Sequence, residues 1–403
     1  MPRLASFRSV HAQGLLRMSL GRCMAVRSGM QATLVVHSKV VMVAFALLLV
    51  LLLVLPAHAA AEKRVNVYNW NDYIAPEVLT QFQRETGIKV VYDVYDSNEM
   101  LEAKLLAGGS GYDVVFPTAR PFAQRHMQRN VYLQLDARAL PNRRNLDPTI
   151  LTSLRDIDPR NDHLLPYTWG TTGIGYNRRA IAQRLGANAQ PNTWRLLFDP
   201  AIAAKLASCG IAVLDDAEEA LHAALIYLGK NPSSTAPADL AAATALFARV
   251  RPHIRYFHSS RYIDDLANGN VCVAMGYSGD VLQARDRARE ARRNVEVAYT
   301  VPREGAIMWV DLMAIPRDAP NRAHALAFVN FLMRPDIMAK ISNEVAYANG
   351  NAAATPLLDP AIRNDPGIYP DRATMARMKT AKNLTAAERR ARTRAFTRIR
   401  TGR

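Results

Sequence analysis

Strand-like and helix-like segments alternate along this chain, and the alternation restricts its fold more than any other feature. Short apolar runs with β-branched and aromatic residues predict three strands at 64–70, 88–95 and 112–117. Helical spacing predicts helices between them, at 75–87 and 98–109. A similar set follows within 209–302. This order predicts an α/β fold in which helices cover both faces of a parallel sheet.

One carboxylate interrupts the most apolar of these runs. Residues 306–316, AIMWVDLMAIP, predict a buried strand that ends at Pro316, and Asp311 is its only charged residue. An unpaired buried carboxylate is strongly unfavourable. Asp311 is therefore expected either to form a structural salt bridge or to face a cationic ligand.

Three more acids stand where a predicted strand gives way to a helix. Asp72 follows the first strand, Glu218 begins the helix after 209–215, and Asp280 follows the strand around 271–279. Each of these acids could instead have a purely structural role. Asp72 could stabilise a turn or cap a helix, Glu218 could interact with the helix dipole, and Asp280 could be an N-cap. Ligands of open α/β sheets, however, bind beyond the carboxyl ends of the strands.

Aromatic residues accompany these acids. Trp70 and Tyr73 flank Asp72, Tyr277 precedes Asp280, and Trp309 shares a strand face with Asp311. Rings beside carboxylates suit a cation with an apolar body, because the ring offers cation–π attraction and packing while the acid takes the charge.

The first 59 residues predict a cleaved secretory signal. They hold six basic and no acidic side chains, then a long apolar run and an A-x-A pattern ending at Ala59. A transmembrane anchor is the alternative.

Residues 371–403 hold eleven basic and two acidic side chains, so only +1 of the net charge of +16 belongs to residues 60–370. The basic composition therefore does not indicate nucleic-acid binding.

Two cysteines follow the predicted signal. Cys209 and Cys272 form an even pair in an oxidising compartment and predict a disulfide, with two buried free thiols as the alternative. Their spacing fits no zinc motif, and the sequence has no nucleophile elbow, Walker loop or H-E-x-x-H motif. We therefore expect neither an enzyme nor a metal or cofactor.

Several stretches, in order, resemble the polyamine-binding periplasmic proteins of bacterial ABC transporters, most closely their putrescine-binding branch. They include YNWNDYIAPEV, LPYTWGTTGIGYN, SCGIAVLDDAEEA, HIRYFHSSRYIDDLANG, GYSGD and REGAIMWVDLMAIP. The resemblance covers essentially all of the chain after the signal. It implies a monomeric periplasmic receptor that binds a polyamine and delivers it to an inner-membrane ABC permease. The alternatives are a preference for spermidine, or a sensory or surface protein with the same fold.

The fold of that family is a two-lobed venus flytrap (type II periplasmic-binding-protein fold) whose chain crosses between the lobes three times. Carried over, the first lobe takes 63–169 and 310–373, and the second takes 170–309 and 374–403. The arginine-rich end of the chain would be either a solvated helix that covers the second lobe, the reading we favour, or a contact for anionic lipid or the permease.

The resemblance also implies a set of ligand contacts. They are Trp70, Asn71, Asp72, Tyr73, Thr118, Glu218, Ser259, Tyr277, Asp280, Trp309, Asp311 and Tyr347. Four of these depart from the putrescine-binding pattern. Asn71 replaces a serine or threonine, Thr118 replaces a serine, Tyr277 replaces a tryptophan, and Trp309 replaces a phenylalanine. The amine class survives these changes, but the preferred amine does not follow from them.

Overall fold

The computed structural model describes residues 62–402, so the predicted signal at 1–59 lies outside the described residues. Within 62–402 the strands form one sheet of eleven. They are β1 (Arg64–Trp70), β2 (Lys89–Tyr95), β3 (Val114–Val115), β4 (Leu164–Asn177), β5 (Ile211–Val213), β6 (Ile254–Phe257), β7 (Val273–Tyr277), β8 (Val297–Thr300), β9 (Ala306–Ala314), β10 (Ala348–Asn349) and β11 (Met378–Lys379).

Helices follow most of these strands and confirm the predicted alternation. They are α2 (Pro76–Thr86), α3 (Asn98–Leu106), α4 (Gln124–Gln128), α5 (Pro148–Ser153), α6 (Arg178–Leu185), α7 (Arg195–Phe198), α8 (Pro200–Leu206), α9 (Ala217–Tyr227), α10 (Pro237–Val250), α11 (Tyr262–Asn268), α12 (Ser278–Glu290), α13 (Arg322–Leu332), α14 (Pro335–Val345), α15 (Pro360–Arg363), α16 (Arg372–Met375) and α17 (Ala386–Thr401).

Local signals explain the first of these elements. Helix α2 begins with Pro76 in its first turn and ends at Gly87, whose φ of 67° caps the helix in the left-handed conformation. Its buried residues Val78 and Phe82 lie four apart, on the face that packs against the core. In β1, Val65 and Val67 are fully buried on one side of the sheet.

The sheet is mixed, so the prediction of a purely parallel sheet is wrong. Its main order is β2-β1-β3-β9-β4-β7-β5-β6. Strand β1 is parallel to β2 and β3, and β5 is parallel to β6 and β7. The long strands β4 and β9 run antiparallel to each other and to their other main neighbours, β7, β8 and β3. Alternation along the sequence fixes element types, but it does not show in which direction a long strand crosses a sheet.

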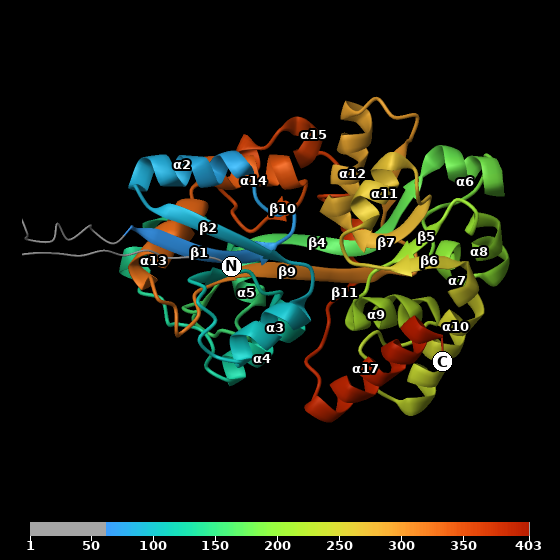
Figure 1. Ribbon diagram of the computed structural model, residues 1–403, viewed down its shortest axis with the longest axis horizontal. Coiled ribbons are helices and arrows are strands. Elements are labelled where there is room, and N and C mark those ends of the chain that lie inside the picture. The colour runs from blue at the N-terminus through green and yellow to red at the C-terminus, as the bar shows by residue number, and fades with distance from the viewer. Residues whose placement is uncertain (1–61, 403) are drawn as a thin grey trace, which may run out of the picture. The chain divides into compact units, whose positions relative to one another are not determined.

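Strands β4 and β9 join the two parallel sets. Figure 1 shows them side by side through the middle of the sheet, between β1 and β2 at one end and β5, β6 and β7 at the other. Strand β9 pairs with β3 through Ala314, and β4 pairs with β7 through residues 172–176. The parallel strands of both sets therefore point their carboxyl ends toward the region between them.

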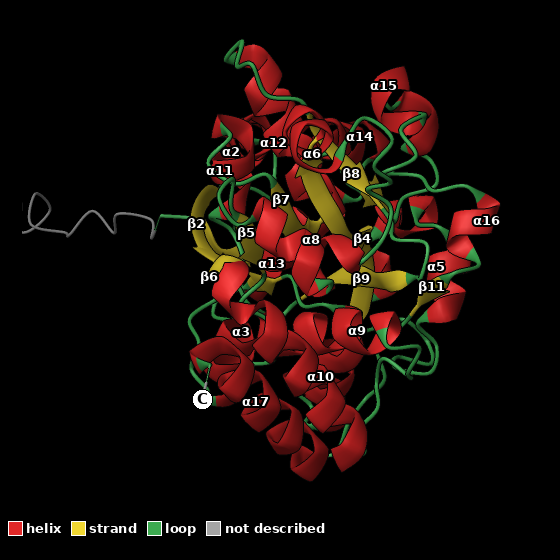
Figure 2. Cartoon of the chain, turned by 90° about the vertical axis from the view of Figure 1, so that its right-hand side faces the viewer, coloured by secondary structure: helices red, strands yellow, loops and turns green. Residues whose placement is uncertain are grey.

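Helices cover both faces of the sheet. Helices α2 and α14 lie above β1 and β2 in Figure 1, and α11 and α12 lie above β7. Below β7 lie α9, α10 and α17, and Figure 2 shows α17 beside α10. The arginine-rich end of the chain is thus a helix, as predicted, and it packs on α9 and α10 through Ala395, Phe396 and Ile399. Among residues 62–402 no helix is both long enough and apolar enough to span a membrane.

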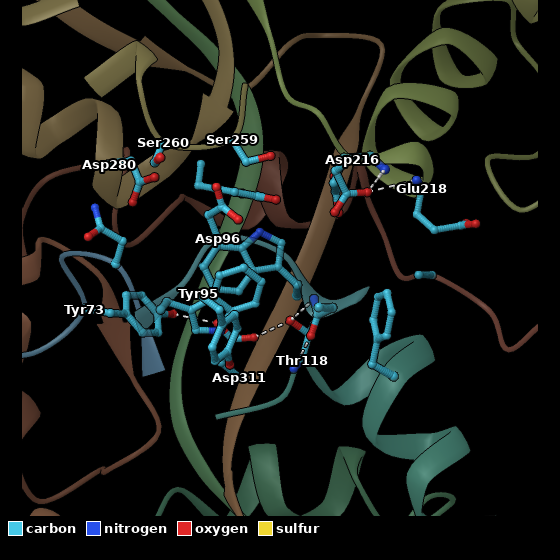
Figure 3. A pocket seen from close by; sticks show the side chains of 18 of the residues that line it. Tyr73, Tyr95, Asp96, Thr118, Asp216, Glu218, Ser259, Ser260, Asp280 and Asp311 are labelled. Carbon is cyan, nitrogen blue, oxygen red and sulfur yellow. Dashed lines mark hydrogen bonds between the residues drawn. The ribbon is translucent and has the colours of Figure 1, made fainter. Parts of the chain in front are cut away.

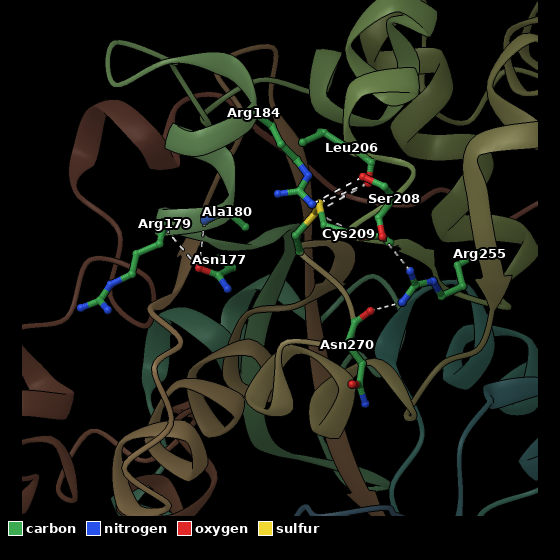
Figure 4. Close-up of a disulfide and its surroundings, with 11 residues drawn as sticks. Asn177, Arg179, Ala180, Arg184, Leu206, Ser208, Cys209, Arg255 and Asn270 are labelled. Atoms are coloured by element: carbon green, nitrogen blue, oxygen red, sulfur yellow. Dashed lines mark hydrogen bonds between the residues drawn. A yellow bond between two sulfur atoms is a disulfide. The ribbon is translucent and has the colours of Figure 1, made fainter.

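The predicted disulfide between Cys209 and Cys272 is present (Figure 4). Their Cα atoms are 5.5 Å apart, and the two residues precede the parallel neighbours β5 and β7. The bond therefore links segments 63 residues apart at the start of the second parallel set.

Candidate binding site

A cavity opens where the carboxyl ends of the two parallel sets face each other, and it and its open mouth together hold about 720 Å³ of empty space. Its walls come from the ends of β1, β2 and β3, from the first turns of α9, α11 and α12, and from the middle of β9. Eleven of the twelve predicted ligand contacts line it: Trp70, Asn71, Tyr73, Thr118, Glu218, Ser259, Tyr277, Asp280, Trp309, Asp311 and Tyr347.

Asp311 lines this cavity, and its side-chain partners among residues 62–402 are neutral. Its side chain is on β9 opposite Thr118, and the residue is 3% exposed. Thr118 Oγ1 donates to Asp311 Oδ1 at 2.6 Å, and Tyr73 OH donates to Oδ2 at 2.8 Å (Figure 3). Burial raises the pKa of Asp311 to about 7, the charge of Asp280 adds to the rise, and the two hydroxyls oppose it. Among residues 62–402 no cationic side chain pairs with Asp311, so the structural salt bridge considered from the sequence is not found in that part of the chain.

Asp280 repeats this arrangement on the other side of the cavity. It stands in the first turn of α12, and its carboxylate accepts from Tyr262 OH and from Tyr347 OH, both at 2.7 Å. It does not cap the helix, because Tyr277 occupies the N-cap position. Burial raises the pKa of Asp280 to about 6. Gly279 makes room for this contact, since a Cβ there would lie 2.4 Å from the Tyr347 ring.

Aromatic rings fill the wall between these two carboxylates. Trp309 packs edge-on against Tyr277 and Tyr347, with centroids 5.8 and 5.3 Å apart, and Tyr347 contacts Tyr73 at 5.1 Å. Trp70 is held in place by the hydrogen bond from its Nε1 to the carbonyl of Phe116. The rings form a continuous apolar surface with a carboxylate at two places on its border.

Four buried polar atoms of the lining residues lack a hydrogen-bond partner among residues 62–402: Ser259 Oγ, Trp309 Nε1, Glu219 Oε2 and His222 Nδ1. Buried polar groups are nearly always paired in folded proteins, so unpaired groups on a cavity wall indicate a polar ligand or water.

The first turn of α9 adds two carboxylates that the sequence analysis missed. Asp216 caps the helix by accepting from the amides of Glu218 and Glu219, and both Asp216 and Glu219 line the cavity. Burial raises the pKa of Asp216 to about 6 and that of Glu219 to about 8, and the negative charge of Glu218 adds to both rises. The sequence D-A-E-E before an apolar helix is a recognisable N-terminal signal for Asp216, but it does not show which of the acids face inward.

Glu218 also lines the cavity, but it already has a cationic partner. Arg392 of α17 places Nε 3.0 Å from Glu218 Oε2. His222, one turn along α9, lies 3.6 Å from the same carboxylate, and burial together with the charge of Arg392 lowers the pKa of His222 well below its ordinary value. The imidazole is therefore neutral, and within the described part of the chain Arg392 is the cation that balances the charge of Glu218.

Asp72 is the one predicted contact that does not line the cavity. It occupies the turn after β1 with a φ of 52°, which points its side chain toward α12. There Arg287 Nη2 lies 2.9 Å from Asp72 Oδ2, and about a third of each side chain is exposed. The turn geometry sends Asp72 to Arg287, whereas its neighbours Trp70 and Tyr73 turn inward. Neither the turn nor Arg287 could be placed from the sequence.

Tyr95, Asp96, Asn98 and Tyr262 also belong to the surroundings of the site, and they too were missed. The first three line the cavity, and Asn98 holds Thr118 by accepting from its amide and donating to its hydroxyl at 2.9 Å. Tyr95 and Asp96 stand at the end of a predicted strand, which was the available signal.

One cluster away from the cavity has the composition of a metal site. Asp158, Asp162 and His163 lie close together within the described residues. Asp158, however, accepts hydrogen bonds from the amides of His163 and Leu164, and Asp162 pairs with Arg160 at 2.8 Å. The cluster is accounted for as a hydrogen-bonded turn before β4.

Comparisons with known proteins agree with this geometry. Residues 77–370 match the family model described as bacterial extracellular solute-binding protein. The chain is 54% identical over 346 residues to the putrescine-binding periplasmic protein SpuD of Pseudomonas aeruginosa, covering 86% of this chain and 94% of that protein. It is 48% identical to the putrescine-binding periplasmic protein PotF of Escherichia coli, covering 85% and 93%.

A solved structure shows the same fold. It is titled a putative spermidine/putrescine ABC transporter from Listeria monocytogenes. It superposes with a TM-score of 0.75 at 30% identity and covers 85% of this chain and all of that one. The arrangement of strands around the cavity is therefore that of a known binding-protein fold.

Proposed function

This chain belongs to the bacterial extracellular solute-binding proteins, and on that premise we propose that it is a periplasmic receptor for putrescine or a similar diamine. It delivers the diamine to an ABC importer in the inner membrane. It is a receptor and not an enzyme, in keeping with relatives that are named as binding proteins.

One observation carries the proposal. Asp311 and Asp280 are buried carboxylates on the same cavity, and each is held by two neutral hydroxyls. Buried carboxylates are normally paired with a cation. An extended diamine supplies one ammonium for each of them, and its methylene chain suits the aromatic surface between them.

The other predicted contacts take supporting roles in this proposal. The rings of Trp70, Tyr73, Tyr277, Trp309 and Tyr347 pack the methylenes. Asn71, Thr118 and Ser259 offer polar atoms, and the unpaired hydroxyl of Ser259 supports such a contact. Asp72 joins the rim through Arg287, and Glu218 takes the separate role described below.

We also propose the lobe architecture of the family. The first lobe takes 63–169 and 310–373, and the second takes 170–309 and 374–403. The chain crosses between them three times, in β4, in β9 and near 370–378. Support comes from β4 and β9, which pair with each other, while β9 also pairs with β3 of the first parallel set and β4 with β7 of the second. The pairing of β11 with the start of β9 supports the third crossing. The receptor acts as a monomer that closes on its ligand.

A spermidine-preferring receptor is the second candidate. Asp216 and Glu219 support it, because they offer additional negative charge in the same cavity. A triamine would place its third ammonium there.

Calorimetric titration tests the proposal. The full chain is expressed in a bacterial host, purified from the periplasm, and unfolded and refolded to remove any bound amine. Putrescine, cadaverine, agmatine and spermidine are then titrated separately. Micromolar or tighter binding of putrescine is expected. If a folded sample bound none of the four, the proposal would be wrong, and tighter binding of spermidine would favour the second candidate.

A further inference from the structure

We infer that Arg392 of the C-terminal helix is a specificity-determining residue, which neutralises Glu218 and thereby sets how strongly the α9 end of the cavity attracts a cation. The inference rests on the proposed function. It changes the role of Glu218 from a contact for the ligand's ammonium to the partner of a protein cation.

Arg392 is held in position by more than Glu218. The residue is 0% exposed, and its Nη1 donates to the carbonyls of Pro232 and Ser234 at 3.1 and 2.9 Å. These carbonyls belong to the connection between α9 and α10, and the arginine comes from α17, 174 residues after Glu218. Three segments therefore fix the guanidinium behind the cavity wall.

The pairing geometry turns Glu218 toward this cation. Arg392 Nε lies 3.2 and 3.0 Å from the two oxygens of Glu218, and the Glu218 side chain is only 13% exposed. In Figure 3 the Glu218 side chain extends from α9 away from Asp280 and Asp311. A carboxylate held in this way has its charge balanced before a ligand arrives.

The other carboxylates of the cavity differ in this respect. Within residues 62–402, none of the others forms a salt bridge: these are Asp96, Asp216, Glu219, Asp280 and Asp311. One oxygen of Glu219 is buried without any partner in that part of the chain. Among the six carboxylates that line the cavity, Arg392 therefore neutralises one, and the other five remain available to a cationic ligand.

A buried charge next to the cavity acts on a bound ammonium without touching it, because the low local dielectric screens it poorly. Removing Glu218 leaves the guanidinium unbalanced, so it repels the ligand. Removing Arg392 leaves the carboxylate unbalanced, so it attracts the ligand. Removing both charges returns the wall to neutrality.

A double-mutant cycle in ligand affinity tests this reasoning. The variants are Glu218→Gln, Arg392→Met and the pair together, each titrated with putrescine and spermidine as the full chain. Arg394→Met is the matched control, because Arg394 is exposed on the same helix. We expect about tenfold weaker binding for E218Q and about fivefold tighter binding for R392M. The pair should recover most of the affinity that E218Q loses, with the larger changes for spermidine because it carries more charge.

The outcomes separate the possible roles. If the double variant binds as weakly as E218Q, Glu218 contacts the ligand itself and the inference is wrong. If R392M and the pair both weaken binding to a similar degree, Arg392 only supports the fold. If R392M does not fold, the comparison of E218Q with the pair still decides. A wild-type protein that binds no amine would overturn the proposed function as well, whereas amine binding without recovery in the pair would overturn the inference alone.

Discussion

Replacing Asp311 by asparagine should weaken ligand binding and, at the same time, stabilise the ligand-free protein. The side chain keeps its shape, and its two neighbours can adapt. Thr118 and Tyr73 now donate to the carboxylate, and either hydroxyl can rotate to accept from an amide instead. The substitution therefore removes a charge without opening a cavity.

The magnitude of the stability change follows from the raised pKa. Burial lifts the pKa of Asp311 from 3.8 to about 7, which corresponds to a cost of about 4 kcal/mol for the ionised form, at about 1.4 kcal/mol for each pH unit. We take this as an upper limit and expect a gain of about 1–3 kcal/mol, because the site relaxes and admits water.

The sign of the pH dependence is fixed by the same shift. Below pH 3.8 the carboxyl is protonated in both the folded and unfolded protein, so the substitution changes nothing. Between pH 3.8 and about 7 the unfolded chain releases the proton before the folded protein does, and the native state loses stability relative to the variant. Above about pH 7 the difference is complete.

The effect on binding has the opposite sign. A ligand ammonium that loses a buried carboxylate partner loses about 2–3 kcal/mol, or roughly 30- to 150-fold in affinity. Calorimetry with putrescine at pH 8 measures the affinity, and urea unfolding at pH 4 and pH 8 without ligand measures the stability. Glu290→Gln, an exposed carboxylate on α12, is the matched control and should change neither.

Two results would refute this reasoning. Unchanged putrescine affinity in D311N would mean that Asp311 does not meet the ligand. A loss of stability in D311N that is larger at pH 8 than at pH 4 would mean that the ionised carboxylate is a net stabilising group and that its hydrogen bonds outweigh its burial.

Three further expectations follow from the same structure. Putrescine binding should release protons at pH 6–7 and tighten as the pH rises to 8, because Asp311 and Asp280 have pKa values of about 7 and 6 and must ionise to receive the ligand. Titrations in buffers of different ionisation enthalpy measure the proton release. Binding without proton release would contradict the ion-pair role. Tyr73→Phe should cost about 1–2 kcal/mol of putrescine affinity, because the carboxylate loses a donor that holds it in position; equal affinity would mean that Thr118 alone suffices. Replacing both Cys209 and Cys272 by serine should lower the free energy of unfolding by about 2–4 kcal/mol, because the disulfide is lost. The putrescine affinity should stay the same, because the disulfide lies away from the cavity. An unchanged urea midpoint would show that the bond does not stabilise the fold.

Much of the fold followed from local patterns. The strand at 64–70 and the helix that starts at Pro76 are found where apolar spacing, Pro76 and Gly87 place them. The disulfide followed from an even pair of cysteines in an oxidising compartment. The antiparallel course of β4 and β9 could not be predicted, because a strand's pattern of burial is the same in either direction.

The candidate site, like the fold, could be predicted from the sequence only in part. A charged residue inside an apolar run singled out Asp311, and the cavity does contain it. Asp72 had an equally good pattern, but a turn with positive φ directs it to Arg287. Glu219 and Glu218 are neighbours in the same helical turn, and only the packing of α17 shows which of them is paired with an arginine.

The sequence by itself determined the element types and the disulfide, and it predicted a cationic ligand, because each depends on the chemistry of residues that are close in the chain or on burial that local pattern reveals. The tertiary structure alone decided which carboxylates are free. Charge compensation at this site depends on Arg392 and Arg287, which lie 174 and 215 residues from their partners in the chain. The strength of an ion pair depends on distance in space and on burial, and neither can be read from separation along the sequence.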